Sequence, residues 1–180
     1  MPIVISPTDI TKLLDSPDIS KPLEIRNKAI MELIYGSGLR LSEISGLNIE
    51  DLDIDNKSGI VKGKGSKYRT ILFGEIAQKW LLIYIKEVRG KLNKEFNNAL
   101  WLNRYGMKLS SRSIQNMIKK YVIKSNLDPA IHTHSLRHSY ATHMLDGGAD
   151  LRYLQELLGH QSPNTTQIYT HISTQKSRDV

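Results

Sequence analysis

The sequence predicts a mainly α-helical domain with a small three-stranded antiparallel β-sheet. Its 180 residues are about the length of one domain, and 39% hydrophobic with 24% charged residues is a globular composition. Apolar residues recur at helical spacing over most of the chain and alternate only between Asp51 and Phe73. We find no internal repeat, low-complexity tract or flexible linker, so we expect one domain over residues 1–180.

Helices are expected in the segment that precedes the sheet. Pro7-Thr8-Asp9 opens a short helix that runs through Leu14, and a second apolar stripe predicts a helix over Pro22–Tyr35. Gly36-Ser37-Gly38 ends this second helix, because glycine commonly terminates helices. A third short helix is expected at Ser42–Leu47.

The alternating block from Asp51 to Phe73 predicts a small antiparallel meander. Two turn-forming segments, Asn56–Gly59 and Gly63–Ser66, divide this block into strands. Lys64 would then lie at the tip of the second turn. The expected strands are Leu52–Asp55, Ile60–Lys62 and Tyr68–Leu72.

Helices return after the sheet and continue to the end of the sequence. Thr133 is expected to cap one of them, which Gly147-Gly148 ends, and Asp150 is expected to cap the next. Pro163 suits the first turn of the last helix, which would carry Tyr169. The expected helices are Glu75–Arg89, Ser111–Ser125, Ser135–Leu145, Leu151–Leu158 and a last one from Ser162.

The formal net charge is +7, but the two parts of the chain differ in sign. Residues 1–55 contain ten acidic and five basic side chains, so residues 56–180 carry a net charge of +12. Asn56–Thr70 and Phe96–Leu127 contain lysine and arginine but no acidic residue. Such stretches suit a polyanion, and nucleic acid is the partner we expect. A basic surface that only faces solvent is the alternative.

Composition argues against several other classes of protein. The longest apolar run, Trp80–Ile85, is far shorter than the roughly 20 residues of a membrane-spanning helix, so no membrane association is expected. Residues 1–7 carry no export signal, which predicts a cytoplasmic, DNA-associated location. The absence of cysteine excludes disulfides, thiolate metal sites and cysteine nucleophiles.

All six histidines lie in the last fifty residues, and they allow more than one interpretation. His134 and His138 could bind a metal from one helical face, but no carboxylate stands between them, so no metal is expected. Capping and surface histidines are the plainer alternative. His134 also shares a helical face with Arg137, which pairs a proton carrier with an anion-binding group. Arg40, after the glycine-rich break, is a further anion-binding candidate or an ordinary surface arginine.

Five sequence blocks together resemble the catalytic domain of tyrosine site-specific recombinases, the phage-integrase family, and most closely its Xer-type members. Each block alone is a weak pattern, but five blocks in the family's order form a specific one. They span residues 35–171, nearly the whole chain. The blocks are Tyr35–Ile44 (YGSGLRLSEI), Gly63–Arg69 (GKGSKYR), His134–Ser139 (HSLRHS), Leu157–His160 (LLGH) and Tyr169–His171 (YTH).

The resemblance implies a tyrosine recombinase catalytic-domain fold that breaks and rejoins DNA without a metal or other cofactor. Tyr169 would attack the scissile phosphate to form a 3′-phosphotyrosyl link, while two arginines bind the negative charge that develops. Either nearby cations would favour the tyrosine phenolate or His134 would accept the tyrosine proton, and Lys64 would protonate the departing 5′ oxygen. The implied catalytic residues are Arg40, Lys64, His134, Arg137, His160 and Tyr169. The residues expected to contact DNA are Lys62, Lys67, Arg69, Arg112, Lys119 and Lys120.

The chain departs from the family pattern outside this domain. Relatives carry an N-terminal core-binding domain that closes over DNA, and we expect residues 1–180 to be the catalytic domain without it. DNA binding would then be weaker, because fewer phosphates are contacted. Eleven residues follow Tyr169, so assembly of a homotetramer on DNA is left open.

The leading interpretation is a site-specific recombinase or integrase that acts on double-stranded DNA. A type IB topoisomerase would use the same chemistry on a single duplex without a partner site. A non-catalytic DNA-binding regulator is an alternative from another class, although such a protein has no reason to retain a nucleophile. A metal-dependent nuclease would differ by losing activity in a chelator.

Overall fold

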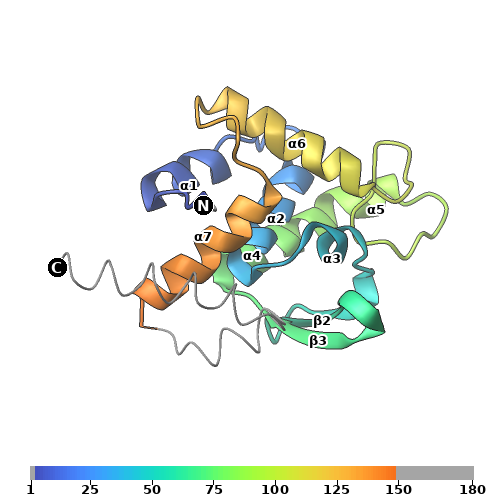
Figure 1. Cartoon of the computed structure of the whole chain (residues 1–180). Coiled ribbons are helices and arrows are strands. Elements are labelled where there is room, and N and C mark those ends of the chain that lie inside the picture. Colours follow the sequence, from blue (N-terminus) through green and yellow to red (C-terminus); the bar gives the residue numbers. More distant parts are fainter. Residues whose placement is uncertain (1–2, 149–180) are drawn as a thin grey trace.

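Helix α2 (Pro22–Ser37) lies at the centre of the computed structural model, which describes residues 3–148 (Figure 1). Helices α4 (Glu75–Ile83) and α7 (Thr133–Asp146) pack against it. Consecutive residues of α2 are buried on all sides, so its polar side chains need partners inside the protein. Lys28 Nζ accordingly lies 2.9 Å from Glu32 Oε1, one turn along the same helix.

The short helix α1 (Pro7–Leu14) packs against α2. The Ser6 hydroxyl accepts a hydrogen bond from the Asp9 amide at 3.2 Å and caps the first turn. At the other end of α1, Lys28 Nζ donates to the carbonyl oxygen of Leu14 at 2.7 Å. This bond holds the end of α1 against the middle of α2.

Gly38 separates α2 from α3 (Leu41–Ser45). Its φ of 69° lies in the left-handed region, which glycine adopts without the steric penalty of a side chain. The Gly38 amide also donates to the Ile34 carbonyl at 2.8 Å, which closes the last turn of α2. The predicted helix end in the segment 36–38 is therefore confirmed.

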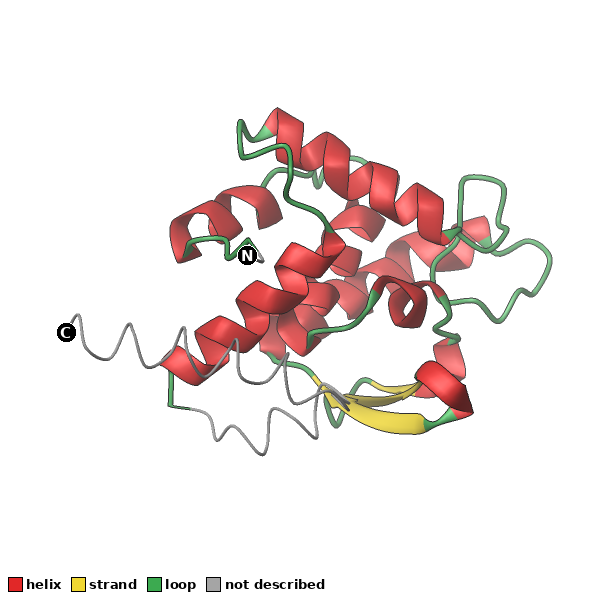
Figure 2. Ribbon diagram, in the orientation of Figure 1, coloured by secondary structure: helices red, strands yellow, loops and turns green. Residues whose placement is uncertain are grey.

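Three antiparallel strands lie along one edge of the helical body, where Figure 2 shows them in yellow. Val61 and Ile71 are buried, whereas Ile60 and Tyr68 on the opposite face are exposed, as expected for a sheet with one covered face. The strands are β1 (Leu52–Asp53), β2 (Ser58–Lys62) and β3 (Tyr68–Leu72). Single 3₁₀ turns, Ile49–Asp51 and Lys64–Ser66, precede β1 and join β2 to β3.

The helix predicted over Glu75–Arg89 is present, but it changes geometry along its length. After α4 the chain forms a π-helical segment (Tyr84–Arg89) and a last turn, α5 (Gly90–Leu92). The Tyr84 hydroxyl donates to the Leu100 carbonyl at 2.7 Å, and Arg89 Nη2 donates to the Ala99 carbonyl at 2.8 Å. These bonds fasten the loop that leads to α6 onto the core.

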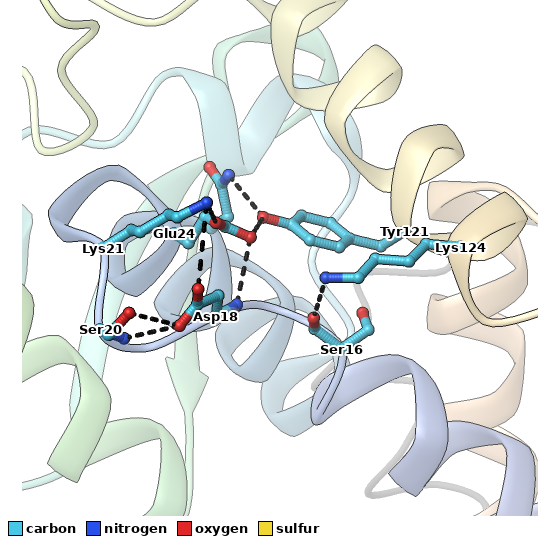
Figure 3. A network of polar contacts seen from close by, with 8 residues as sticks. Ser16, Asp18, Ser20, Lys21, Glu24, Tyr121 and Lys124 are labelled. Atoms are coloured by element: carbon cyan, nitrogen blue, oxygen red, sulfur yellow. Dashed lines mark hydrogen bonds and ion pairs between the residues drawn. The ribbon is translucent and has the colours of Figure 1, made fainter.

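Helix α6 (Ser111–Lys124) is joined to α2 and to the loop between α1 and α2 by the polar network in Figure 3. The Tyr121 hydroxyl donates to Glu24 Oε1 at 3.0 Å and accepts from Asn27 Nδ2 at 3.0 Å. Lys124 Nζ donates to the Ser16 carbonyl at 2.9 Å. At least one lysine of the acid-free stretch therefore has a structural partner.

Several expected boundaries are wrong, among them the start of the second strand, which is Ser58 rather than Ile60. Thr133 is the first residue of α7 rather than its cap; His132 takes the cap position, and its amide donates to the Ser135 hydroxyl at 3.2 Å. The first strand ends at Asp53, because the Asp53 carboxylate accepts from the Asn56 side chain at 2.8 Å and starts the turn early. The third helix covers Leu41–Ser45 instead of Ser42–Leu47. The helices expected at Leu151–Leu158 and from Ser162 lie outside the described residues.

Candidate active site

Arg40 occupies the position directly before α3. Its backbone is extended, with φ −77° and ψ 156°, and its amide donates to Glu43 Oε1 at 2.8 Å. A carboxylate at the third helical position that accepts from the cap amide is a common feature of helix starts. Because α2 ends at Ser37 and α3 begins at Leu41, only three residues lie between the two helices, and Arg40 is held close to both helix ends.

Arg137 is the buried cation of the site. It lies on α7, and its side chain is 1% exposed. Arg137 Nη1 donates to the carbonyl oxygen of Gly38 at 2.7 Å and lies 3.7 Å from Glu43 Oε1. A buried charge is costly unless it is paired and hydrogen-bonded. The left-handed glycine turn and the Glu43 carboxylate together provide those partners.

Glu43 connects three parts of the site. Besides its contacts with Arg40 and Arg137, it accepts from Arg69 Nε at 2.9 Å and from Arg69 Nη2 at 2.8 Å. Burial alone would raise the pKa of the Glu43 carboxyl group. Hydrogen bonds from Arg69 and the Arg40 amide, with the charges of Arg69 and Arg137, instead hold that pKa below its ordinary value. Glu43 is therefore a carboxylate at neutral pH.

A cavity of about 540 Å³ opens between α3, α6 and α7. The first residues of α6 and α7, each a helix of 14 residues, contribute to its wall. The amino ends of helices attract anions, because their amide groups point outward and carry partial positive charge. Three of the implied catalytic residues line the same cavity: Arg40, His134 and Arg137.

His134 belongs to a row of three histidine rings at the start of α7. Its ring centroid lies 4.0 Å from that of His138, edge to face, and 6.1 Å from that of His132. Burial lowers the pKa of His134, and the charges of Arg137, His132 and Arg40 lower it further. His134 is therefore neutral at pH 7 and can accept a proton.

His138 lies deeper than His134 and is 6% exposed. Burial, followed by the charges of His134, Arg137 and His132, lowers the pKa of His138 to about 4. Its sequence position suggested no role, and it is absent from the cavity wall. Its edge-to-face contact makes it a packing partner for the His134 ring.

Lys64 lies in the turn between β2 and β3, as expected, but it is absent from the wall of the cavity. The turn is exposed, and it is closed by a 2.7 Å hydrogen bond from the Gly63 amide to the Lys67 carbonyl. Gly65 has a φ of 74°, which favours glycine at the tip. The hairpin passes beside the site, since a Cβ atom on Gly63 would lie 3.7 Å from Glu43 Oε2.

The residues expected to contact DNA have different surroundings. Lys62 and Lys67 are exposed on the hairpin, and Arg112, Lys119 and Lys120 are exposed on α6, whose first turn reaches the cavity. Arg69 is only 11% exposed, and its Nε and Nη2 atoms donate to the Glu43 carboxylate. A contact between Arg69 and DNA stays a prediction without support from this geometry.

Glu43 is the site residue that sequence reasoning missed. It belongs to the block that carries Arg40, but it received no role. One signal could have found it, because an acidic residue three positions after a helix cap commonly reaches back to the cap amide. Nothing in the spacing, however, indicates the ion pair with Arg69, which lies 26 residues later.

Among residues 3–148, no group of three or more histidine, aspartate or glutamate side chains is arranged to hold a metal ion. None of the helices in this part of the chain has the length and apolar character needed to cross a bilayer. His160 and Tyr169, the other implied catalytic residues, lie outside the described residues.

The sequence is similar to known proteins over nearly its whole length. The phage integrase family matches residues 4–176. Tyrosine recombinase XerD of Corynebacterium glutamicum is 43% identical over the whole chain, which covers 60% of that protein. Tyrosine recombinase XerC of Escherichia coli O157:H7 is 44% identical, with 59% of its length covered. The chain therefore spans about three fifths of these relatives.

Solved structures give the same result for the fold. The crystal structure of XerA recombinase matches 95% of this chain and 61% of its own, with a TM-score of 0.85 and 30% identity. XerH site-specific recombinase, bound to palindromic difH substrate in a post-cleavage complex, matches 99% of this chain and 52% of its own, with a TM-score of 0.83 and 29% identity. The mainly helical fold with a three-stranded sheet is thus the tyrosine recombinase catalytic-domain fold.

Proposed function

Because this chain belongs to the phage integrase family, we propose that it is a Xer-like site-specific recombinase. It would cleave and rejoin DNA strands through a covalent 3′-phosphotyrosyl intermediate. One observation carries the proposal: buried Arg137, fixed by Gly38 and Glu43, lines the same cavity as Arg40 and His134. The high identity to tyrosine recombinases XerC and XerD supports it.

The cavity suits a phosphodiester in its transition state. Attack on phosphorus places extra negative charge on the phosphate oxygens, and two guanidinium groups can donate planar, charge-assisted hydrogen bonds to them. Arg137 is held in place before substrate arrives, so little reorganisation is needed when that charge develops. The amino ends of α6 and α7 add positive potential at the same place.

The remaining steps move protons to and from the reacting oxygens. Neutral His134 can accept the proton of the Tyr169 hydroxyl as that oxygen attacks phosphorus. His160 would donate a further hydrogen bond to the phosphate. Lys64 would protonate the departing 5′ oxygen once the β2–β3 hairpin brings it to the cleaved bond. The roles of Tyr169, His160 and Lys64 come from the family resemblance.

The proposal extends to the partner and the organisation of the chain. Double-stranded DNA is the proposed substrate, and the structural relative XerH was solved in complex with its difH substrate. Residues 1–180 would be the catalytic domain, with assembly of copies on DNA and action in the cytoplasm. Exposed lysines on the hairpin and on α6 would contact the phosphate backbone.

Denaturing electrophoresis with nicked suicide DNA tests the proposal. The nick lets the cleaved fragment diffuse away, so a recombinase remains bonded to DNA. We expect a slow-moving band that survives detergent and chelator and disappears after protease treatment. DNA binding in a native gel without this band would instead identify a non-catalytic binder. A band that accompanies relaxation of a single plasmid, without strand exchange between two sites, would identify a topoisomerase.

A further inference from the structure

Arg69 joins the β-hairpin to the start of α3. It lies on β3, and its Nε and Nη2 atoms donate to the two oxygens of Glu43, at 2.9 and 2.8 Å. Such two-pronged pairing of a guanidinium with a carboxylate fixes relative orientation as well as distance. The contact therefore constrains the hairpin with respect to the segment that carries Arg40.

Burial distinguishes this ion pair from the others near the sheet. The side chains of Arg69 and Glu43 are 11% and 1% exposed, respectively. Lys57 and Glu75 also form a pair beside the sheet, at 3.6 Å, but the Glu75 side chain is 86% exposed. Exposed pairs contribute little, whereas removal of one member of a buried pair leaves an unbalanced charge. Lys57 is therefore a matched control for Arg69.

The position of Arg69 within the hairpin links it to Lys64. Arg69 pairs with Val61 on the neighbouring strand. The next pair, Lys62 with Tyr68, is the last one before the turn. Beyond that pair the chain forms the exposed turn that contains Lys64. The orientation of this turn is thus set by the strands beneath it, and Arg69 fixes one of them to Glu43.

Glu43 is also the residue that organises the two arginines of the cavity. It accepts from the Arg40 amide and lies 3.7 Å from Arg137 Nη1. One carboxylate therefore contacts the segments that hold both phosphate-binding arginines and the strand that leads to Lys64. A shift of the hairpin would change the distance between the proposed proton donor and the phosphate.

We propose that Arg69 is a positioning residue, which acts through Glu43 to hold Lys64 in register with Arg40 and Arg137. This inference rests on the proposed recombinase function. It replaces the expectation that Arg69 contacts DNA, because its guanidinium is engaged with Glu43 inside the protein. Arg69 would thus affect protonation of the departing oxygen without touching DNA.

Cleavage of two substrates tests how Arg69 acts. In one, the bridging 5′ atom is oxygen; in the other it is sulfur, which leaves as a thiolate and needs no proton donor. Misplaced catalytic groups commonly cost on the order of 10²-fold in rate, and we expect a loss of this size for Arg69→Gln on normal DNA. On the sulfur substrate Arg69→Gln and Lys64→Ala should both return to within several-fold of wild type. Lys57→Gln should match wild type on both.

DNA-binding measurements separate positioning from phosphate contact. Arg69→Gln should keep the wild-type dependence of binding on salt, because no counterion-releasing contact is lost. A smaller salt dependence would overturn the proposal in favour of a direct phosphate contact. Sulfur rescue of Lys64→Ala without rescue of Arg69→Gln would also overturn it, as would rescue of neither variant.

Hydrogen exchange provides a readout that does not depend on activity. The backbone amides of residues 62–68 should exchange about tenfold faster in Arg69→Gln, with those of α2 unchanged. Arg69→Lys, which keeps the charge that balances Glu43, should fold and show a smaller increase. Unchanged exchange of the hairpin would contradict the proposal. If the wild-type protein forms no covalent complex with DNA, the proposed recombinase function is wrong. The hydrogen-exchange measurement then still shows whether Arg69 holds the hairpin.

Discussion

Arg137 Nη1 donates a hydrogen bond of 2.7 Å to the carbonyl oxygen of Gly38, which lies 99 residues earlier in the chain. Gly38 has the left-handed backbone that ends α2, so this carbonyl is aimed by the turn itself. The same turn leads to Arg40 two residues later. One glycine turn therefore sets the positions of both arginines at the cavity.

Arg137→Lys should cleave DNA about 10²–10³-fold more slowly than wild type. Lysine keeps the positive charge, but a single ammonium cannot hold the Gly38 carbonyl and also present a planar pair of donors to phosphate. Single-turnover cleavage of nicked DNA measures the rate. Arg104→Lys, a change at an exposed loop arginine, should have no effect. Near-normal cleavage by Arg137→Lys would make Arg137 a structural residue.

The two lysines of the hairpin turn should differ in their response to sulfur at the bridging 5′ position. Lys64→Ala should be slow on normal DNA and recover on the sulfur substrate, because a thiolate leaves without a proton. Lys67→Ala should lose only a phosphate contact and show no such recovery. Cleavage rates on both substrates measure this. Recovery confined to Lys67→Ala would transfer the acid role to Lys67.

Replacing both Lys119 and Lys120 by glutamate should weaken DNA binding without moving the cleavage position. Both side chains are exposed on α6, away from the residues that line the cavity. Loss of phosphate contacts should also make binding less dependent on salt. Titration at several salt concentrations and sequencing of the cleaved ends measure the two effects. The control is the double variant Lys86→Glu and Lys91→Glu, which changes exposed lysines of the π-helical segment and of α5. An equal loss of binding in this control would mean that net charge alone matters.

His138 should make the protein less stable as the pH falls below about 6.5. The unfolded chain binds a proton at His138 near that pH, whereas the folded protein resists protonation until about pH 4, so acid favours unfolding between these values. Between pH 7.5 and 5.5 we expect a loss of about 1 kcal/mol of unfolding free energy that His138→Gln does not show. Urea unfolding of both proteins at the two pH values measures this difference. Equal losses in wild type and variant would mean that His138 titrates normally when folded.

Much of the fold could be predicted because local signals and tertiary packing agree. The proline and glycine residues around α2 and the alternation between Asp51 and Phe73 each predict an element that the structure contains. The boundaries at Thr133 and Asp53 differ because single side-chain hydrogen bonds set them. Such bonds depend on which neighbouring polar side chain lies within hydrogen-bond distance of the backbone or of another side chain. The spacing of apolar residues carries no information about this.

The candidate site was less predictable than the fold, for a physical reason. Arg40, His134 and Arg137 meet at one cavity as the resemblance implies. Glu43 and Arg69 form a long-range pair that brings together α3 and β3, and only the tertiary structure creates it. In the sequence Arg69 is one more basic residue of an acid-free stretch, so it suggested DNA rather than a buried partner.

The identity of the residue bonded to DNA tests the central claim most directly. Wild-type protein trapped on nicked DNA can be digested with protease and nuclease, and mass spectrometry can locate the remaining nucleotide on a peptide. We predict that it is attached to Tyr169 through a 3′ phosphate. Tyr169→Phe should bind DNA and form no adduct, whereas Tyr105→Phe, which changes an exposed tyrosine, should form the adduct normally. Attachment to any other residue, or an adduct that persists in Tyr169→Phe, would contradict the account.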